Sequence, residues 1–136
     1  MARYLFKKKE KLTGKKNIDQ LFQTGHFFKI DSFKIIWQVV ENCISENNSR
    51  LLISVPKKTI KKSVNRNLIK RRIREAYRTN KISHLNFLKE NNISVHWGVI
   101  YLSTEIPSFR EIKKNMILIL HRLDKEIGHK ITNNIN

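Results

Sequence analysis

Residues 50–79 read R-L-L-I-S-V-P-K-K-T-I-K-K-S-V-N-R-N-L-I-K-R-R-I-R-E-A-Y-R-T, and this stretch decides the fold. Its first part predicts a strand over 50–55, which Pro56 ends because proline has no N–H for a sheet ladder. Its second part predicts a helix over 63–79, because apolar residues recur there at helical spacing. The apolar arc of this helix, wide enough to pack on a sheet, holds Ile69, Ile73, Ala76 and Tyr77.

The same helix carries a ridge of cations beside its apolar arc. Residues four apart lie nearly above one another on a helix, so they form a continuous line of side chains. A solvated charged face normally mixes signs, whereas only Glu75 interrupts the cations here. Arginine also suits bidentate contact with phosphates or guanine edges. The ridge consists of Arg66, Lys70, Arg74 and Arg78, extended by Arg71 and Asn67.

The positive charge is concentrated in two segments. The 136 residues include 28 basic and 11 acidic side chains, for a net charge of +17. Residues 1–16 hold seven basic side chains and one acidic, and residues 57–78 hold ten and one, so the rest of the chain is nearly neutral. Closely spaced phosphates release counterions when such segments dock. The charge distribution therefore predicts a nucleic-acid partner.

Shorter patterns predict the other elements. A helix over 17–24 is followed by Gly25 at the position of a C-terminal cap. Ser108, with Glu111 three residues later, forms a capping box that opens a last helix. The second predicted strand lies inside the sheet, because both of its faces carry apolar residues. The further strands are predicted over 26–30, 33–40 and 95–103.

Together these elements predict a single domain over 1–136, of the α+β class. The order αβββαβα is typical of an α/β sandwich, here a four-stranded sheet with helices packed on it. A turn is expected over 42–49, and a polar loop between the basic helix and the last strand. The expected loose ends are a basic N-terminal arm over 1–11 and a disordered, asparagine-rich tail over 128–136.

The sequence predicts a soluble, cytoplasmic protein with no membrane partner. Its longest unbroken apolar run, 116–120, is far shorter than the roughly 20 residues of a membrane span. The charged N-terminus lacks the apolar region of a secretion signal. The single cysteine, Cys43, cannot pair within the chain, which fits a reducing compartment.

No catalytic or metal site is predicted on the protein, and no small-molecule substrate. A protein nuclease needs carboxylates or histidines grouped around one or two metal ions. The acidic residues are scattered without a D-x-D or E-x-D pair, and no two histidines have metal-ligand spacing. Neither a glycine-rich phosphate loop nor a nucleophile elbow occurs. We expect surface or edge positions for all five histidines: His26, His84, His96, His121 and His129.

The order of residues around the basic helix is more specific than its charge. I-S-V-P-K-K, residues 53–58, leads into R-N-L-I-K-R-R-I-R-E, residues 66–75. The pattern R-N-x-x-K-R-x-x-R resembles the signature of the bacterial ribonuclease P protein family. K-L-T-G-K-K-N-I-D-Q-L-F-Q-T-G, residues 11–25, is similar to the first helix of that family, and S-F-R-E-I-K-K, residues 108–114, to its C-terminal helix. The resemblance spans residues 11–123.

The resemblance implies a fold detail and a function. It implies a left-handed βαβ crossover through the basic helix, where the usual rule favours the right-handed form. It also implies a ribonucleoprotein endonuclease in which the protein joins a catalytic RNA and removes the 5′ leader from precursor tRNA. The RNA carries the Mg²⁺-dependent hydrolysis, so no cofactor is expected on the protein itself. The implied partners are the catalytic RNA and the single-stranded leader.

The matched positions imply which residues contact RNA. Phe22 matches one of two aromatic positions that line the leader cleft, and Ile18 stands at the other, where it offers apolar contact without stacking. Leu102 to Glu105 replace basic residues of the family after the fourth strand, and Lys34 is the candidate for the missing phosphate contact. The other implied contacts are Ser54, Lys57, Lys58, Arg66, Asn67, Lys70, Arg71 and Arg74. Lys61 and Lys62 are also predicted to contact RNA, as cations of the same basic segment.

Composition leaves other binding functions open. One alternative is a structural RNA-binding protein of the ribosome or translation apparatus, which would bind folded RNA without affecting tRNA maturation. Another is a DNA-binding protein with the basic helix in a major groove. The second is disfavoured because Asn67 is the main uncharged polar residue of the ridge that can read bases.

Overall fold

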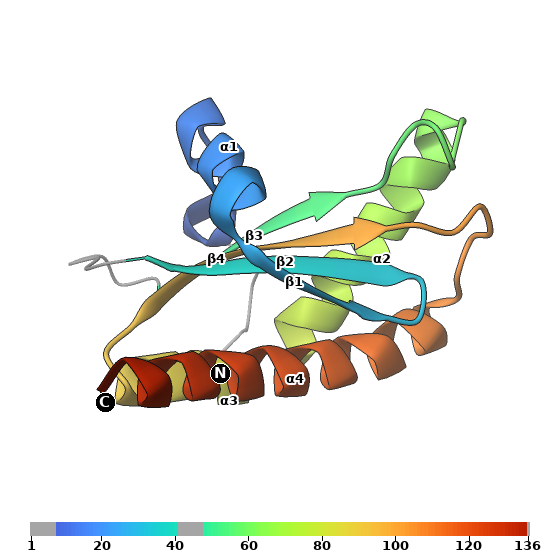
Figure 1. The fold of residues 1–136 in the computed structure, drawn as a ribbon. Coiled ribbons are helices and arrows are strands. Elements are labelled where there is room, and N and C mark those ends of the chain that lie inside the picture. Colours follow the sequence, from blue (N-terminus) through green and yellow to red (C-terminus); the bar gives the residue numbers. More distant parts are fainter. Residues whose placement is uncertain (1–7, 41–47, 136) are drawn as a thin grey trace.

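The computed structural model describes residues 8–40 and 48–135, and it shows one sheet between two layers of helices (Figure 1). The α+β class and the predicted order of strands and helices are confirmed, with one further helix, α3, before the last strand. The elements are the 3₁₀ helix η1 (Lys8–Glu10), α1 (Lys15–Thr24), β1 (His26–Ile30), β2 (Phe33–Val40), β3 (Ser49–Ser54), α2 (Ser63–Asn80), α3 (Ile82–Glu90), β4 (Ser94–Tyr101) and α4 (Phe109–Ile135).

The sheet is mixed, in the order β1-β2-β4-β3. β2 pairs antiparallel with β1 and with β4, which confirms its predicted place inside the sheet. β3 instead pairs parallel with β4 at the sheet edge. Parallel neighbours need a crossover, and α2 and α3 provide it. The left-handed sense of this crossover stays a prediction.

The larger core lies between the sheet and the layer of α2, α3 and α4. Alternate residues of a strand point to the same face, so Trp37 of β2 lies beside Trp97 of β4 on the side of these helices. Tyr77 of α2 meets the Trp97 ring edge-on, with centroids 5.7 Å apart. The predicted arc of α2 is confirmed, because its four members are all fully buried: Ile69, Ile73, Ala76 and Tyr77.

A smaller core lies on the opposite face, beneath α1. Leu12 and Leu21 pack there against Ile36 of β2. Gly25 joins α1 directly to β1 in extended backbone, with φ of −74°. A Cβ at Gly25 would lie 2.5 Å from the Leu21 carbonyl oxygen and 3.1 Å from that of Trp37. Glycine is therefore required at this helix end because of a close backbone approach, not because of a left-handed conformation.

The prediction of a polar loop before β4 is wrong, because residues 82–90 form the helix α3. This helix buries Leu88 and His84, which lie one turn apart on the face toward α4. His84 is only 1% exposed, so its predicted surface position is also wrong. Apolar spacing alone did not reveal α3, because a histidine supplies half of its buried face.

A buried hydrogen-bond chain explains how His84 is accommodated. The indole N–H of Trp97 donates to the hydroxyl oxygen of Ser49 at 2.9 Å, and that oxygen lies 2.8 Å from His84 Nε2. His84 Nδ1 lies 2.5 Å from a carboxylate oxygen of Asp124 on α4. A carboxylate only accepts, so Nδ1 carries the hydrogen and, in the neutral ring, Nε2 accepts from the serine hydroxyl. The chain ties α3 to β3, β4 and α4.

The prediction of a disordered tail over 128–136 is wrong for residues 128–135, because α4 continues to Ile135. Ile127 is fully buried and Ile131 packs against the same core, so the apolar stripe of α4 extends past Gly128. Of the predicted capping box, the serine cap is confirmed, since the hydroxyl oxygen of Ser108 accepts the N–H of Glu111 at 3.2 Å. The predicted turn over 42–49 lies mostly outside the described residues, and Ser49 already belongs to β3.

The described end of the N-terminal arm is anchored rather than loose, and residues 1–7 lie outside the described part. Both carboxylate oxygens of Glu10 accept hydrogen bonds from Lys81 Nζ, at 2.7 and 2.9 Å. The two side chains are 6% and 5% exposed. Lys81 lies between α2 and α3, so this pair fastens η1 to the crossover. Next along the chain, the N–H of Leu12 donates to the Leu51 carbonyl of β3.

Removing one partner of this buried ion pair should destabilise the fold. We expect Glu10→Gln to lower the free energy of unfolding by about 3 kcal/mol or more, because the buried Lys81 ammonium would lose the carboxylate that accepts two of its hydrogen bonds. Replacing both residues, in Glu10→Gln with Lys81→Met, should restore much of that loss. Urea unfolding followed by circular dichroism measures the three values. A single variant as stable as the parent chain would contradict the anchoring role.

Candidate nucleic-acid interface

The ridge of α2 divides into side chains used inside the fold and side chains turned outward. Lys70 and Arg74 are partly exposed and Arg71 and Asn67 are exposed. Among the described residues, no acidic side chain forms a salt bridge with Lys70, Arg71 or Arg74. These three cations therefore remain available for an anionic ligand.

Arg66, predicted to contact RNA, also has a role within the fold. Its Nη1 donates to the carbonyl oxygens of Ile60 and Lys61, at 2.9 and 2.7 Å. The guanidinium thereby fastens the loop that precedes α2. That loop carries the predicted lysines, all of which are exposed: Lys57, Lys58, Lys61 and Lys62. Replacing Arg66 would disturb these lysines as well as remove a charge.

Two further arginines of α2 have partners in the fold. Arg72 Nη1 donates to the Pro107 carbonyl at 2.7 Å and so joins α2 to the start of α4. Arg78 pairs with Glu75 through two hydrogen bonds, and the first cause of the lowered pKa of Glu75 is this bonding. Glu75 thus balances Arg78 and leaves the outward cations of α2 uncompensated. The predicted ridge is therefore confined to its middle part.

A small pocket of about 180 Å³ adjoins this middle part. It lies where Lys11 to Thr13 cover only part of the outer edge of β3. Cations from two separate segments line it, with Lys70 and Arg74 from α2 and Lys11 from the arm. Three cations around an exposed strand edge suit a phosphate. Lys11 was not assigned by the motif, since only the fold brings it to α2.

Helix α1 carries the two residues predicted to line the leader cleft, Ile18 and Phe22. Ile18 is partly buried against the cluster of Leu12, Leu21 and Ile36, so it supports α1. Phe22, four residues further along α1, is 47% exposed. Phe22 therefore presents its ring outside the core, as stacking on a base would require.

Three cross-strand rows of the sheet face beneath α1 carry residues of interest for binding. Ser54 of β3 pairs with Ile100 of β4, which pairs with Lys34 of β2, which pairs with Lys29 of β1. The neighbouring row holds Phe27, Ile36, Gly98 and Leu52. The third row includes His96 beside Arg50. Burial, and then the nearby Arg50 guanidinium, lower the pKa of His96, so we expect this ring to add no charge to the face at neutral pH.

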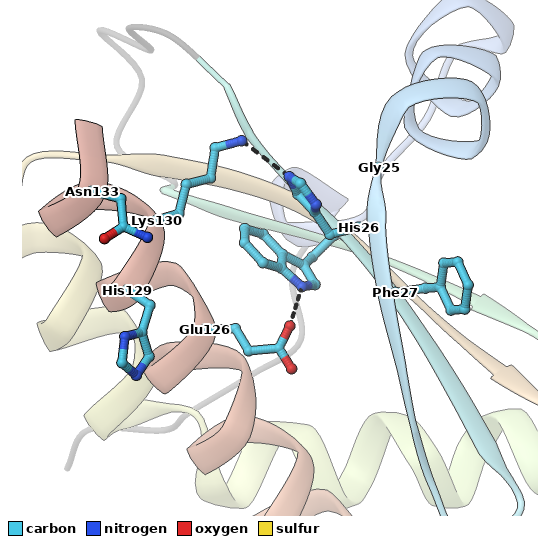
Figure 2. Close-up of a pocket in the computed structure, with 8 residues that line it drawn as sticks. Gly25, His26, Phe27, Glu126, His129, Lys130 and Asn133 are labelled. Carbon is cyan, nitrogen blue, oxygen red and sulfur yellow. Dashed lines mark hydrogen bonds between the residues drawn. The ribbon is translucent and has the colours of Figure 1, made fainter.

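A larger pocket of about 670 Å³ lies on the other side of the sheet, between β1 and the end of α4 (Figure 2). The His26 ring lies over Trp37, with centroids 4.8 Å apart, and the Trp37 indole N–H donates to Glu126 at 3.2 Å. Lys130 Nζ lies 3.0 Å from His26 Nε2. None of the residues predicted from the sequence to contact RNA lines this pocket, although Phe27 borders it from the edge strand β1.

The described part of the chain holds no group of three or more histidine, cysteine or acidic side chains placed to bind a metal ion. Ser49, His84 and Asp124 follow one another as in a hydrolase triad. Ser49 is only 1% exposed, however, and its oxygen already accepts the Trp97 N–H. These three side chains therefore serve the core. Among the described helices, none has the length and apolar character needed to cross a membrane.

Comparisons with known proteins agree on one family. The family model described as Ribonuclease P matches residues 6–124. A protein named "Ribonuclease P protein component" from Porphyromonas gingivalis strain W83 is 32% identical over 117 residues, which cover 85% of this chain and 84% of that protein. The protein of the same name from Petrotoga mobilis is 45% identical over 76 residues, which cover 56% of this chain and 60% of that protein.

Solved structures show the same fold. The RNase P protein of Staphylococcus aureus aligns with a TM-score of 0.66 and 23% identity, covering 84% of this chain and 94% of that one. The RNase P protein of Thermotoga maritima aligns with a TM-score of 0.64 and 23% identity, covering 83% and 96%.

The outward cations of α2 should set the salt dependence of RNA binding. In Lys70→Ala with Arg74→Ala, we expect the slope of log affinity against log salt to become shallower by about 1.4 to 1.8, because two phosphate contacts are lost. Filter binding with a folded bacterial ribonuclease P RNA measures the slope. Lys113→Ala with Lys114→Ala, on the exposed side of α4, is the charge-matched control. Equal slopes in the α2 variant and the parent chain would remove α2 from the interface.

Proposed function

The chain belongs to the ribonuclease P protein family, and from this premise we propose that it is the protein subunit of a bacterial ribonuclease P. In this role it binds the catalytic RNA and the 5′ leader of precursor tRNA, and it promotes endonucleolytic removal of the leader. The observation that carries the proposal is the uncompensated cation group of Lys70, Arg71 and Arg74, on the helix that matches the family motif.

The basic surface of α2 and the aromatic side chain of α1 suit two different RNA partners. The outward cations of α2, with the exposed lysines before it, offer contacts to the backbone of a folded RNA and no base-specific pattern. Helix α1 offers the exposed Phe22 for stacking, and the sheet face beneath α1 offers Ser54 for a polar contact. Stacking on an aromatic ring tolerates any base, which suits a processing enzyme that meets many leaders.

The proposal assigns the chemistry to the RNA. The Mg²⁺ ions that hydrolysis needs would be held by the RNA subunit, since the described acidic residues gather in no cluster. The protein contributes cations and an aromatic ring, which bind and position nucleic acid. No cofactor is proposed for the protein itself.

Reconstitution tests this function directly. Added to a bacterial ribonuclease P RNA at low Mg²⁺, the protein should raise the rate of precursor-tRNA cleavage at the mature 5′ end, because its cations replace part of the screening by Mg²⁺. The protein alone should cleave nothing. Binding to folded RNA without faster cleavage would instead favour a structural protein of the translation apparatus.

Phe22 should act on the leader only. We expect Phe22→Ala to reduce the preference for precursor over mature tRNA by about 5-fold or more, the effect of losing one stacked base. Gln23→Ala, the next exposed residue of α1, serves as the control. Affinities of the reconstituted complex for both tRNA forms measure the preference. Equal loss for both forms would show that Phe22 supports the fold instead.

A further inference from the structure

The sheet face beneath α1 carries a second aromatic side chain that neither core uses. Phe27 of β1 is 64% exposed, whereas Phe28 beside it is 4% exposed. Phe27 pairs with Ile36, so it lies on the face that α1 covers in part. Figure 2 shows its ring pointing away from α4, opposite to His26. The aromatic ring is therefore presented on the same face of the sheet as α1.

Two lysines accompany this ring. Lys34 Nζ lies 4.9 Å from the centroid of the Phe27 ring. Lys34 also pairs directly with Lys29 on β1, and like charges at opposed positions repel. Among the described residues, no acidic side chain forms a salt bridge with either lysine. An anion bound between them would relieve this repulsion.

The cross-strand row connects this group to a residue already expected to contact RNA. Ser54, Ile100, Lys34 and Lys29 follow one another across all four strands. Neighbouring strands are 4.7–4.9 Å apart, so the row is about 14 Å long. Apart from Ile100 it is polar or basic, and each of its side chains is at least partly exposed. A strand of RNA that contacts Ser54 can thus continue along the row to Lys34 and Lys29, beside Phe27 of the neighbouring row.

We propose that Phe27, Lys34 and Lys29 form a further nucleotide position for single-stranded RNA, at the β1 end of the sheet. A base stacks on the Phe27 ring, and the adjoining phosphate contacts the two ammonium groups. The inference rests on the proposed function, because the RNA strand it places here is the 5′ leader of precursor tRNA. In this arrangement β1, which the family motif does not cover, provides part of the leader-binding surface. This position also offers an aromatic ring to a chain that has Ile18 at one of the two α1 positions.

Leader-length dependence tests the position in the reconstituted complex. We expect Phe27→Ala to weaken binding of precursor tRNA with a long leader by about 5- to 100-fold, and to leave mature tRNA unchanged. As the leader is shortened, the difference between the variant and the parent chain should vanish. Phe27→Trp should keep the affinity for the long leader. Phe109→Ala, a partly exposed phenylalanine of α4, is the matched control.

A second measurement uses the protein alone with a fluorescent single-stranded RNA oligonucleotide. Phe27→Ala should weaken this binding. Lys34→Ala should make the slope of log affinity against log salt shallower by about 0.7, the contribution of one phosphate contact on a single strand. Suppose that the parent chain raises cleavage, but Phe27→Ala binds the long-leader precursor tRNA and the oligonucleotide as tightly as the parent chain does. The inference then fails and the proposed function stands. If the parent chain does not raise cleavage, the proposed function fails, and the oligonucleotide still decides whether Phe27 binds RNA. Equal loss for long-leader and mature tRNA would also overturn the inference.

Discussion

The parallel pairing of β3 with β4 is the constraint on which the rest of the structure depends. Parallel neighbours cannot be joined by a hairpin, so the chain must return over one face of the sheet. α2 and α3 make this return, and burial of Ile73 and Leu88 holds them against the core. Since the apolar arc of α2 faces inward, Lys70 and Arg74 are left beside the outer edge of β3. The crossover thus creates the cationic surface and places it at the outer edge of the sheet, which Lys11 to Thr13 cover only in part.

The large positive charge is compatible with folding because several cations serve the fold. Lys81 balances the buried Glu10, and Arg66 and Arg72 donate to backbone carbonyls. The outward cations that remain adjoin β3, the strand that also carries Ser54. The proposed RNA surface and the proposed leader face therefore meet along one strand, which lets a single protein hold a folded RNA and a single strand together.

Local patterns predicted most elements, because the spacing of apolar residues is a property of neighbours in the chain. The arc of α2 was predicted in this way and is confirmed. The serine cap of α4, predicted from Ser108 and Glu111 three residues apart, is also confirmed. The same reasoning failed for α3, where His84 occupies a buried position that no apolar pattern marks. It also failed for the end of α4, because polar residues around Gly128 concealed a stripe that Ile131 continues. The motif identified the cations of α2 as part of the interface, but it did not identify Lys11. Only the pairing of Lys11 with β3 brings that residue close to Lys70 and Arg74.

By itself, the sequence determined the class of fold, the family and the helix that carries the charge, since each depends on residue order over a few turns or strands. Only the tertiary structure decided what individual side chains do. Arg66 turned out to fasten a loop, Glu10 to be buried, and Phe27 to be exposed on the face of α1. These outcomes depend on contacts with other elements, for example between Glu10 and Lys81. Burial and pairing arise only when distant segments pack, so no local pattern could have determined them.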